Sequence, residues 1–174
     1  MVIHLTLVYS GLWFSKEKGF VMAVAKLKEF LDREGVKYSA VSHLPAYTMQ
    51  EVAESAHIPG KQLAKTVIVK LDGEMAMAVL PANQKVIMQD LRDMTGSENV
   101  KFASEAEFEK HFPDCEIGAM PPFGNLYGME VFVAESLAGN EEIAFTAGSH
   151  REVIRMAYSD FDRLVQPKVL NFST

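Results

Sequence analysis

Lys65 is the residue whose position most suggests chemistry. It lies near the start of an apolar, β-branched run, residues 64–71, and shares the period-2 face of Val67, Val69 and Leu71. A lysine at the mouth of an otherwise apolar strand face either extends its ammonium to water or directs it into a pocket. Periodicity alone leaves both interpretations open.

Two glycine-containing segments could act together with such a lysine. Residues 118–124 are Gly-Ala-Met-Pro-Pro-Phe-Gly, and residues 148–150 are Gly-Ser-His. Glycine loops can offer several backbone N–H groups to one oxygen atom, and a nearby ammonium adds positive charge. Such a site suits a carbonyl oxygen, a developing oxyanion or a phosphate. It would favour hydrolysis of an activated ester by water or a neighbouring hydroxyl, where positioning and electrostatics are sufficient.

Other kinds of chemistry are not indicated. The sequence has no His-Glu-x-x-His, Cys-x-x-Cys, nucleophile-elbow, P-loop or dinucleotide-binding pattern, so we expect neither a metal nor another cofactor. The single cysteine, Cys115, excludes an intramolecular disulfide and favours the reducing cytoplasm. His43 and His150 lie in loops beside proline or glycine, where a structural and a functional role are equally expected.

The elements that would position these residues follow from periodicity. Residues 64–71 and 75–80 are predicted strands, joined at Asp72-Gly73, a pair that favours a type I′ turn because it tolerates positive φ. Both strands are apolar on both faces, which indicates a central hairpin that is covered on each side.

The remaining elements surround this hairpin. Thr48-Met-Gln-Glu51 and Ser104-Glu-Ala-Glu107 are capping boxes that predict helix starts. Residues 113–128 form a long loop rich in glycine and proline, which in a compact domain is usually functional or mobile. Helices are expected at 22–34, 48–57, 89–95, 104–112 and 159–165, and further strands at 36–41, 100–103, 129–134, 142–146 and 152–157.

Length and composition fit one globular domain, with 174 residues of which 48% are hydrophobic and 23% charged. The net charge of −6 argues against a protein that coats DNA or RNA, but it allows a pocket that grips one end of a nucleic acid. The apolar run 2–14 is too short to span a bilayer and lacks the basic region of a secretory signal, so no membrane partner is expected. We interpret residues 1–21 as an N-terminal extension from a misassigned start, 22–166 as the domain and 167–174 as a polar tail.

Several motifs, taken in order, resemble the YbaK-like aminoacyl-tRNA editing family, which includes the editing domain inserted in bacterial prolyl-tRNA synthetases. The resemblance covers residues 22–165. Each motif alone is weak, but their order and spacing are fairly specific. The motifs are Ala64-Lys65-Thr66, Ala78-Val79-Leu80-Pro81, Gly118-x-x-Pro121-Pro122-Phe123-Gly124, Glu135-Ser136-Leu137 and Gly148-Ser149-His150.

The resemblance implies a single α+β domain in which a mixed, mostly antiparallel sheet curls toward a barrel with helices packed outside. It implies a trans-acting deacylase that hydrolyses the ester of mischarged tRNA, of the tRNA(Pro) type, at the acceptor end. It also implies prolyl-tRNA synthetase as a partner and a reaction without metal or protein nucleophile. The alternative is a non-catalytic module that uses the same pocket to bind a tRNA end or an aminoacyl-nucleotide.

The resemblance also implies roles for single residues. Lys65 matches a lysine that the family needs for activity, and Gly118 begins the loop that shapes the amino-acid pocket. His150 matches a pocket residue of the synthetase-inserted branch, whereas Met120 departs from the family's loop and would alter the size of the pocket. The other expected substrate contacts are Thr66, Pro121, Pro122, Gly124, Ser149, His43 and Thr48. The amino acid that is removed does not follow from the sequence.

Overall fold

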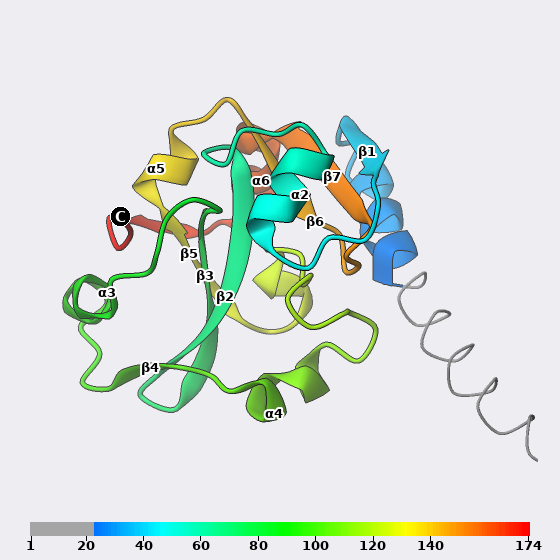
Figure 1. The fold of residues 1–174 in the computed structure, drawn as a ribbon. Coiled ribbons are helices and arrows are strands. Elements are labelled where there is room, and N and C mark those ends of the chain that lie inside the picture. The colour runs from blue at the N-terminus through cyan, green and yellow to red at the C-terminus, as the bar shows by residue number, and fades with distance from the viewer. Residues whose placement is uncertain (1–22) are drawn as a thin grey trace, which may run out of the picture.

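The computed structural model describes residues 23–174, which are built around one eight-stranded sheet (Figure 1). The strand order is β1-β7-β6-β2-β3-β5-β8, and β4 pairs with β2 off this path. The strands are β1 (Tyr38–Ser42), β2 (Leu63–Leu71), β3 (Glu74–Pro81), β4 (Val100–Phe102), β5 (Glu130–Ala134), β6 (Glu142–Thr146), β7 (Glu152–Ala157) and β8 (Lys168–Leu170).

The sheet is mixed, as expected. The pairs β1–β7, β6–β7, β2–β3 and β2–β4 are antiparallel. The pairs β2–β6, β3–β5 and β5–β8 are parallel. Within the described residues β1 and β8 end the strand order without pairing to each other, so the sheet does not close into a barrel.

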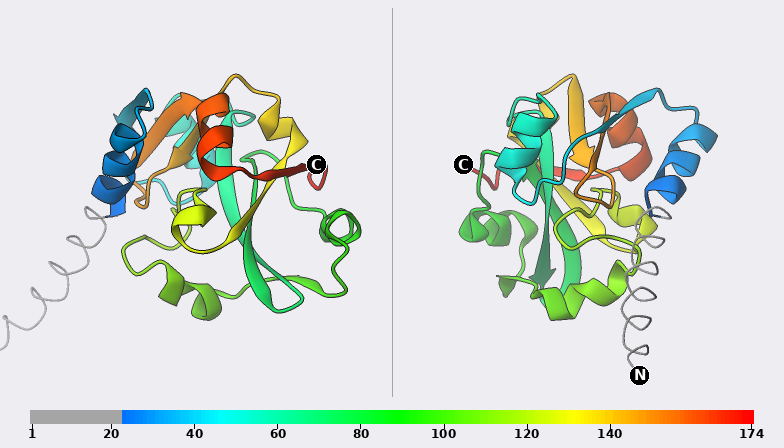
Figure 2. Two further views of the ribbon diagram at one scale, coloured as in Figure 1. Left: turned by 180° about the vertical axis from the view of Figure 1, so that it is seen from behind. Right: turned by 45° about the vertical axis from the view of Figure 1, so that its right-hand side comes forward.

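Helices pack on both faces of the sheet. Seen as in Figure 1, α2 lies in front of β2, whereas α6 and the helix formed by residues 23–33 come forward in the view from behind (Figure 2). The labelled helices are α2 (Met49–Ser55), α3 (Met88–Thr95), α4 (Glu105–Phe108), α5 (Glu135–Ala138) and α6 (Tyr158–Val165), with 3₁₀ turns η1 (Glu109–His111) and η2 (Gly124–Leu126). Among residues 23–174, no helix is both long and apolar enough to cross a membrane.

The β2–β3 hairpin has the predicted register and turn. Ala64 pairs with Pro81 at one end and Leu71 with Glu74 at the other. Asp72 and Gly73 both have positive φ, 51° and 98°, as a type I′ turn requires. One face of the hairpin packs in the main core and the other in a second apolar cluster, so the hairpin is covered on both sides.

The C-terminal residues correct one expectation. Residues 167–174 are not a polar tail beyond the fold, because Lys168–Leu170 forms β8, parallel to β5. Phe172 is fully buried in the second apolar cluster, and Ser173 bridges to Val86. The segment is too short and too polar for its periodicity to show a strand. The interpretation of residues 1–21 lies outside the described residues.

Candidate functional site

Lys65 does not extend freely into water, because its ammonium contacts the protein backbone. It is half-buried, and its ammonium donates hydrogen bonds to the backbone oxygens of Gln84 and, at 3.5 Å, Ala82. Burial is the main cause that lowers the pKa of Lys65 from the ordinary lysine value, and the nearby charge of Lys85 lowers this pKa further. The structure therefore holds a cation whose charge is poorly compensated.

On the side of β2 away from β3, strand pairing is interrupted where Lys65 lies, while Lys65 itself pairs with Leu80 of β3. Pairing with β6 ends at Ala64, opposite Phe145, and pairing with β4 begins only at Val69. Lys65 and Thr146 each lie one residue beyond the last β2–β6 pair, on neighbouring parallel strands, and Thr146 is buried. The chain that leaves β6 toward Gly148-Ser149-His150 therefore starts beside Lys65.

His150 connects this turn to the glycine-containing loop. Its Nε2 lies 2.8 Å from the carbonyl oxygen of Ile117. A carbonyl oxygen can only accept, so Nε2 carries the proton and Nδ1 of the neutral ring is an acceptor. The backbone N–H of His150 donates to the Glu116 carboxylate. A Cβ on Gly118, whose φ is +88°, would lie 3.5 Å from His150 Cε1, so the two residues are neighbours.

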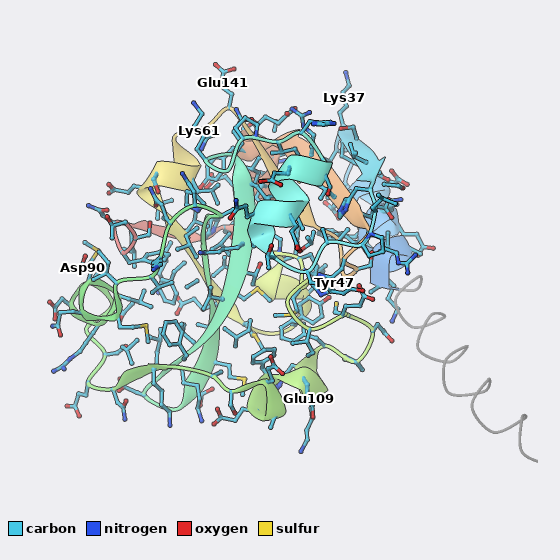
Figure 3. All side chains as sticks on the ribbon, viewed as in Figure 1. Lys37, Tyr47, Lys61, Asp90, Glu109 and Glu141 are labelled. Carbon is cyan, nitrogen blue, oxygen red and sulfur yellow. The ribbon has the colours of Figure 1, made fainter. Side chains whose placement is uncertain are left out.

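The loop of residues 43–47 closes the other side of His150. Its backbone is anchored by hydrogen bonds from His43 N–H to Arg151 O (2.9 Å) and from Ala46 N–H to His150 O (3.1 Å). The Tyr47 ring lies 5.2 Å from the His150 ring, centroid to centroid. Tyr47 is 72% exposed and is labelled in Figure 3. Tyr47 was not among the expected site residues, although an aromatic residue in a loop between His43 and a helix cap is a usable signal.

Some expected contact residues have structural roles in the folded chain. Thr48 caps α2, because its Oγ1 accepts the N–H of Glu51 at 3.2 Å while Glu51 accepts the N–H of Thr48 at 3.0 Å. Gly124 is buried, and a Cβ there would lie 2.7 Å from Met129 O. Thr66 alternates with Lys65 along β2 and so faces the opposite side of the sheet.

The other expected residues divide between the loops. Pro121 and Pro122 are buried within residues 118–124. Ser149 accepts the N–H of Arg151 at 3.4 Å, which stabilises the turn before β7. His43 directs Nδ1 to Leu44 O at 2.7 Å, and its buried Nε2 has no hydrogen-bond partner within residues 23–174. The structure thus brings His43, Gly118, Ser149 and His150 together, whereas Lys65 is related to them through the register of β2 beside β6 and directs its ammonium to Ala82 and Gln84.

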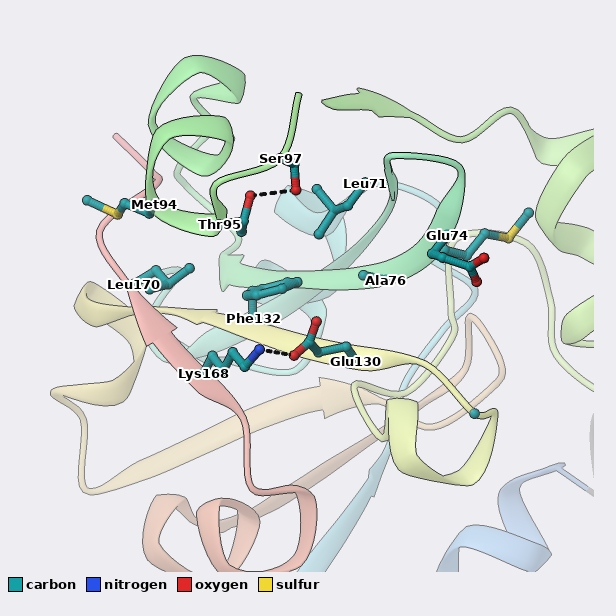
Figure 4. Close-up of a pocket in the computed structure, with 12 residues that line it drawn as sticks. Leu71, Glu74, Ala76, Met94, Thr95, Ser97, Glu130, Phe132, Lys168 and Leu170 are labelled. Atoms are coloured by element: carbon teal, nitrogen blue, oxygen red, sulfur yellow. Dashed lines mark hydrogen bonds and ion pairs between the residues drawn. The ribbon is translucent and has the colours of Figure 1, made fainter. Parts of the chain in front are cut away.

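Two cavities are present outside the group formed by His43, Gly118, Ser149 and His150. One of about 410 Å³ is bordered by α3, β3, β5 and β8, where Lys168 pairs with Glu130 (Figure 4). The second, of about 420 Å³, lies between residues 23–33 and the loop before η2, and Pro121 borders it. Neither is lined by Lys65, Gly118 or His150. In the part of the chain that the structure describes, no three His, Cys, Asp or Glu side chains gather closely enough to hold a metal ion.

Comparisons with known proteins agree on one group. A family model described as an aminoacyl-tRNA editing domain matches residues 43–164. The multifunctional Ser/Thr-tRNA deacylase ProXp-y of Escherichia coli is 29% identical over 153 residues, covering 84% of this chain and 90% of that protein. The prolyl-tRNA editing protein ProX of Acetoanaerobium sticklandii is 25% identical over 142 residues, covering 78% of this chain and 86% of that protein.

Solved structures share the fold. The crystal structure of a protein proposed to be a trans-editing enzyme for prolyl-tRNA synthetase has a TM-score of 0.74 at 18% identity, covering 87% of this chain and 97% of that one. A hypothetical protein has a TM-score of 0.77 at 17% identity, with coverage of 86% and 99%. At these identities the likeness establishes the arrangement of strands and helices.

Proposed function

The chain belongs to the family of aminoacyl-tRNA editing domains, and from this premise we propose that it is a trans-acting deacylase that hydrolyses the ester of mischarged tRNA. The observation that carries the proposal is that the family match, residues 43–164, contains Lys65, Gly118 and His150. The cytoplasm, where aminoacyl-tRNA is used, is the proposed site of action.

Electrostatic stabilisation is the proposed main role of Lys65. Its ammonium contacts only neutral backbone oxygens within the described residues, so an anionic phosphate or a developing oxyanion would be a stronger partner than either. Gly118 N–H donates to Met120 Sδ at 3.3 Å, and a thioether sulfur is a weak acceptor. A substrate oxygen that displaced the Met120 sulfur would accept a stronger hydrogen bond from Gly118 N–H.

His150 and Tyr47 are proposed to bind the two ends of the aminoacyl-adenosine. Nδ1 of His150 is an acceptor that suits the α-amino group of the ester, because Nε2–H is already engaged by Ile117 O. Tyr47 offers an exposed ring on which the terminal base can stack, an interaction worth about 1–3 kcal/mol per base. Water would attack the ester carbonyl, with the neighbouring ribose hydroxyl able to hydrogen-bond to it, since no recognised protein nucleophile lies among these residues. The amino acid leaves with a free carboxylate, and the ribose oxygen takes up a proton and becomes a hydroxyl.

The first substrates to test follow from the named relatives. The Escherichia coli relative is named for Ser- and Thr-tRNA, and the Acetoanaerobium relative for prolyl-tRNA editing. We propose that tRNA(Pro)-type substrates carrying a small wrong amino acid are hydrolysed, with prolyl-tRNA synthetase as the partner that presents or releases them. One methylene changes discrimination in such a pocket by only about 1–3 kcal/mol, so a panel is required.

The experiment follows release of labelled amino acid from seryl-, threonyl-, alanyl- and cysteinyl-tRNA. Wild type, Lys65→Ala and Lys37→Ala run side by side, since Lys37 is an exposed lysine at the molecule's edge (Figure 3) and provides a matched control. Wild type and Lys37→Ala should release at least one amino acid, and Lys65→Ala should be about 100-fold slower or worse. Full turnover by Lys65→Ala would remove Lys65 from the mechanism. No release by wild type, even with prolyl-tRNA synthetase added, would overturn the hydrolase.

A further inference from the structure

Gln84 makes hydrogen bonds in three directions next to Lys65. Its backbone oxygen accepts the Lys65 ammonium. Its side-chain Oε1 accepts the hydroxyl of Ser136 and the hydroxyl of Ser173, each at 2.7 Å. An amide oxygen has two lone pairs, so both hydroxyls can donate to it at once. The residue that receives the Lys65 ammonium is therefore itself fixed by two separate elements.

The two hydroxyls come from distant parts of the sequence. Ser136 lies in the first turn of α5, within the Glu135-Ser136-Leu137 motif. Ser173 belongs to residues 172–174, here called the C-terminal strap, which runs beside residues 85–87. Lys85 N–H donates to Thr174 O at 2.7 Å and Ile87 N–H to Phe172 O at 2.7 Å, while Thr174 N–H donates to Lys85 O at 3.1 Å.

The strap is held by its own burial. Phe172 is fully buried among apolar side chains of β3, β5 and α3. The segment it holds is the connection between β3 and α3, which contributes both carbonyl oxygens that accept the Lys65 ammonium. Backbone hydrogen bonds from Ala82 N–H to Leu63 O (2.7 Å) and from Gln84 N–H to Pro81 O (3.0 Å) shape the start of this connection. The hydrogen bonds from α5 and from the strap add a fixed position for the Gln84 side chain.

We infer that Gln84 is a positioning residue for Lys65, fixed in place by Ser136 and by the C-terminal strap. The inference rests on the proposed function, because it assigns to these residues a role in holding the cation of the deacylation site. It also gives the Glu135-Ser136-Leu137 motif a physical purpose. The charged side chains on the segments that carry these contacts are Lys85, next to Gln84, and Glu135, next to Ser136, and the charge of Lys85 acts on Lys65.

The test compares Gln84→Ala, Gln84→Glu, the double variant Ser136→Ala/Ser173→Ala, and Ser39→Ala. Gln84→Ala and the double variant lose the same two hydrogen bonds, so each should lower kcat/KM about tenfold. Gln84→Glu keeps an oxygen acceptor for both hydroxyls and should recover part of this loss. Ser39 is an exposed serine on β1, and Ser39→Ala should match wild type.

A pH profile separates positioning from a general loss of structure. The carboxylate in Gln84→Glu places a negative charge near Lys65 and favours its ammonium form, so the alkaline decline of kcat/KM should move to higher pH. An unmoved alkaline decline in Gln84→Glu would overturn the inference. Full kcat/KM in the double variant would overturn it equally.

A second measurement does not depend on turnover. Reductive ¹³C-methylation of lysines allows the pKa of Lys65 to be followed by NMR, with Lys65→Arg used to assign its signal. A higher pKa of Lys65 in Gln84→Glu than in wild type supports the positioning contact. This holds even if wild type releases no amino acid, a result that would contradict only the hydrolase proposal. Equal pKa values in the two proteins would overturn the contact while leaving the hydrolase proposal to its own assay.

Discussion

Gly124→Ala is expected to destabilise the fold rather than to remove a substrate contact. A Cβ at this position would lie 2.5 Å from Val131 Cγ2 and 2.7 Å from Met129 O. Met129 O belongs to the backbone and cannot rotate away, and Gly124 O accepts the N–H of both Tyr127 and Met129 at 2.9 Å. The substitution must therefore move the backbone of two segments that are tied to each other.

The magnitude follows from overpacking. Extra atoms in a close-packed site cost about 1–3 kcal/mol, and a clash with backbone places Gly124→Ala near the upper end, at about 2–3 kcal/mol. For a chain of this length, 1 kcal/mol corresponds to about 2–4 °C in Tm, so the expected decrease is about 4–12 °C. The assay is thermal unfolding monitored by circular dichroism, together with deacylation measured well below the transition.

Gly118→Ala is the matched comparison, because the same motif contains both glycines. Gly118 has φ of +88°, and a Cβ there would lie 3.5 Å from His150 Cε1 and 3.9 Å from His150 Nε2. The cost in stability is the strain of a left-handed alanine, about 1–2 kcal/mol, while the added methyl group enters the proposed site. Gly118→Ala should lower kcat/KM more than Gly124→Ala does at a temperature where both are folded. A Gly124→Ala protein with wild-type Tm and reduced activity would refute this division of roles.

Three further predictions concern charge and stacking. The lowered pKa of Lys65 should make enzymatic release, corrected for spontaneous ester hydrolysis, decline at a pH below the ordinary lysine value of 10.5, as a pH profile of kcat/KM would show. Tyr47→Ala should raise KM about 5- to 100-fold, whereas Tyr47→Trp should not, as steady-state kinetics would show. Hydrogen bonds from Lys70 and Ser104 lower the pKa of Glu107 to about 2. Because the unfolded carboxyl has the higher pKa, Glu107 stabilises the fold above pH about 4.5 and this contribution is lost toward pH 2; the difference in Tm between wild type and Glu107→Gln should therefore shrink over that interval.

Local signals predicted the hairpin and the helix starts well because each depends on a few neighbouring residues. Asp72-Gly73 gave the turn, since positive φ at both positions is a local requirement. The capping box at Thr48 and Glu51 forms as predicted. The mixed sheet followed from the family resemblance, since the sequence alone does not determine which strands pair in parallel.

Features that depend on distant partners were missed. The C-terminal strap is polar at Ser173 and Thr174, and only Phe172, buried by elements far away in sequence, shows that it is part of the fold. Helix α5 has four residues, which is too short for a helical period to be visible. The resemblance implied that Thr48 and Gly124 are substrate contacts, whereas in the structure Thr48 caps α2 and Gly124 packs against Met129, roles that the motif does not distinguish from binding.

The sequence shows the position of Lys65 but not the contacts that its ammonium makes. The Lys65 ammonium is half-buried beside Lys85 and has only backbone oxygens as its described acceptors, which is unfavourable for folding. An apolar side chain would suit this strand face better, as Leu63 does two residues earlier in β2. Local rules of this kind are broken chiefly at functional sites. The conflict was visible in the sequence as one lysine in an apolar alternation. Its resolution, through Gln84, α5 and the C-terminal strap, required contacts that only the folded chain contains.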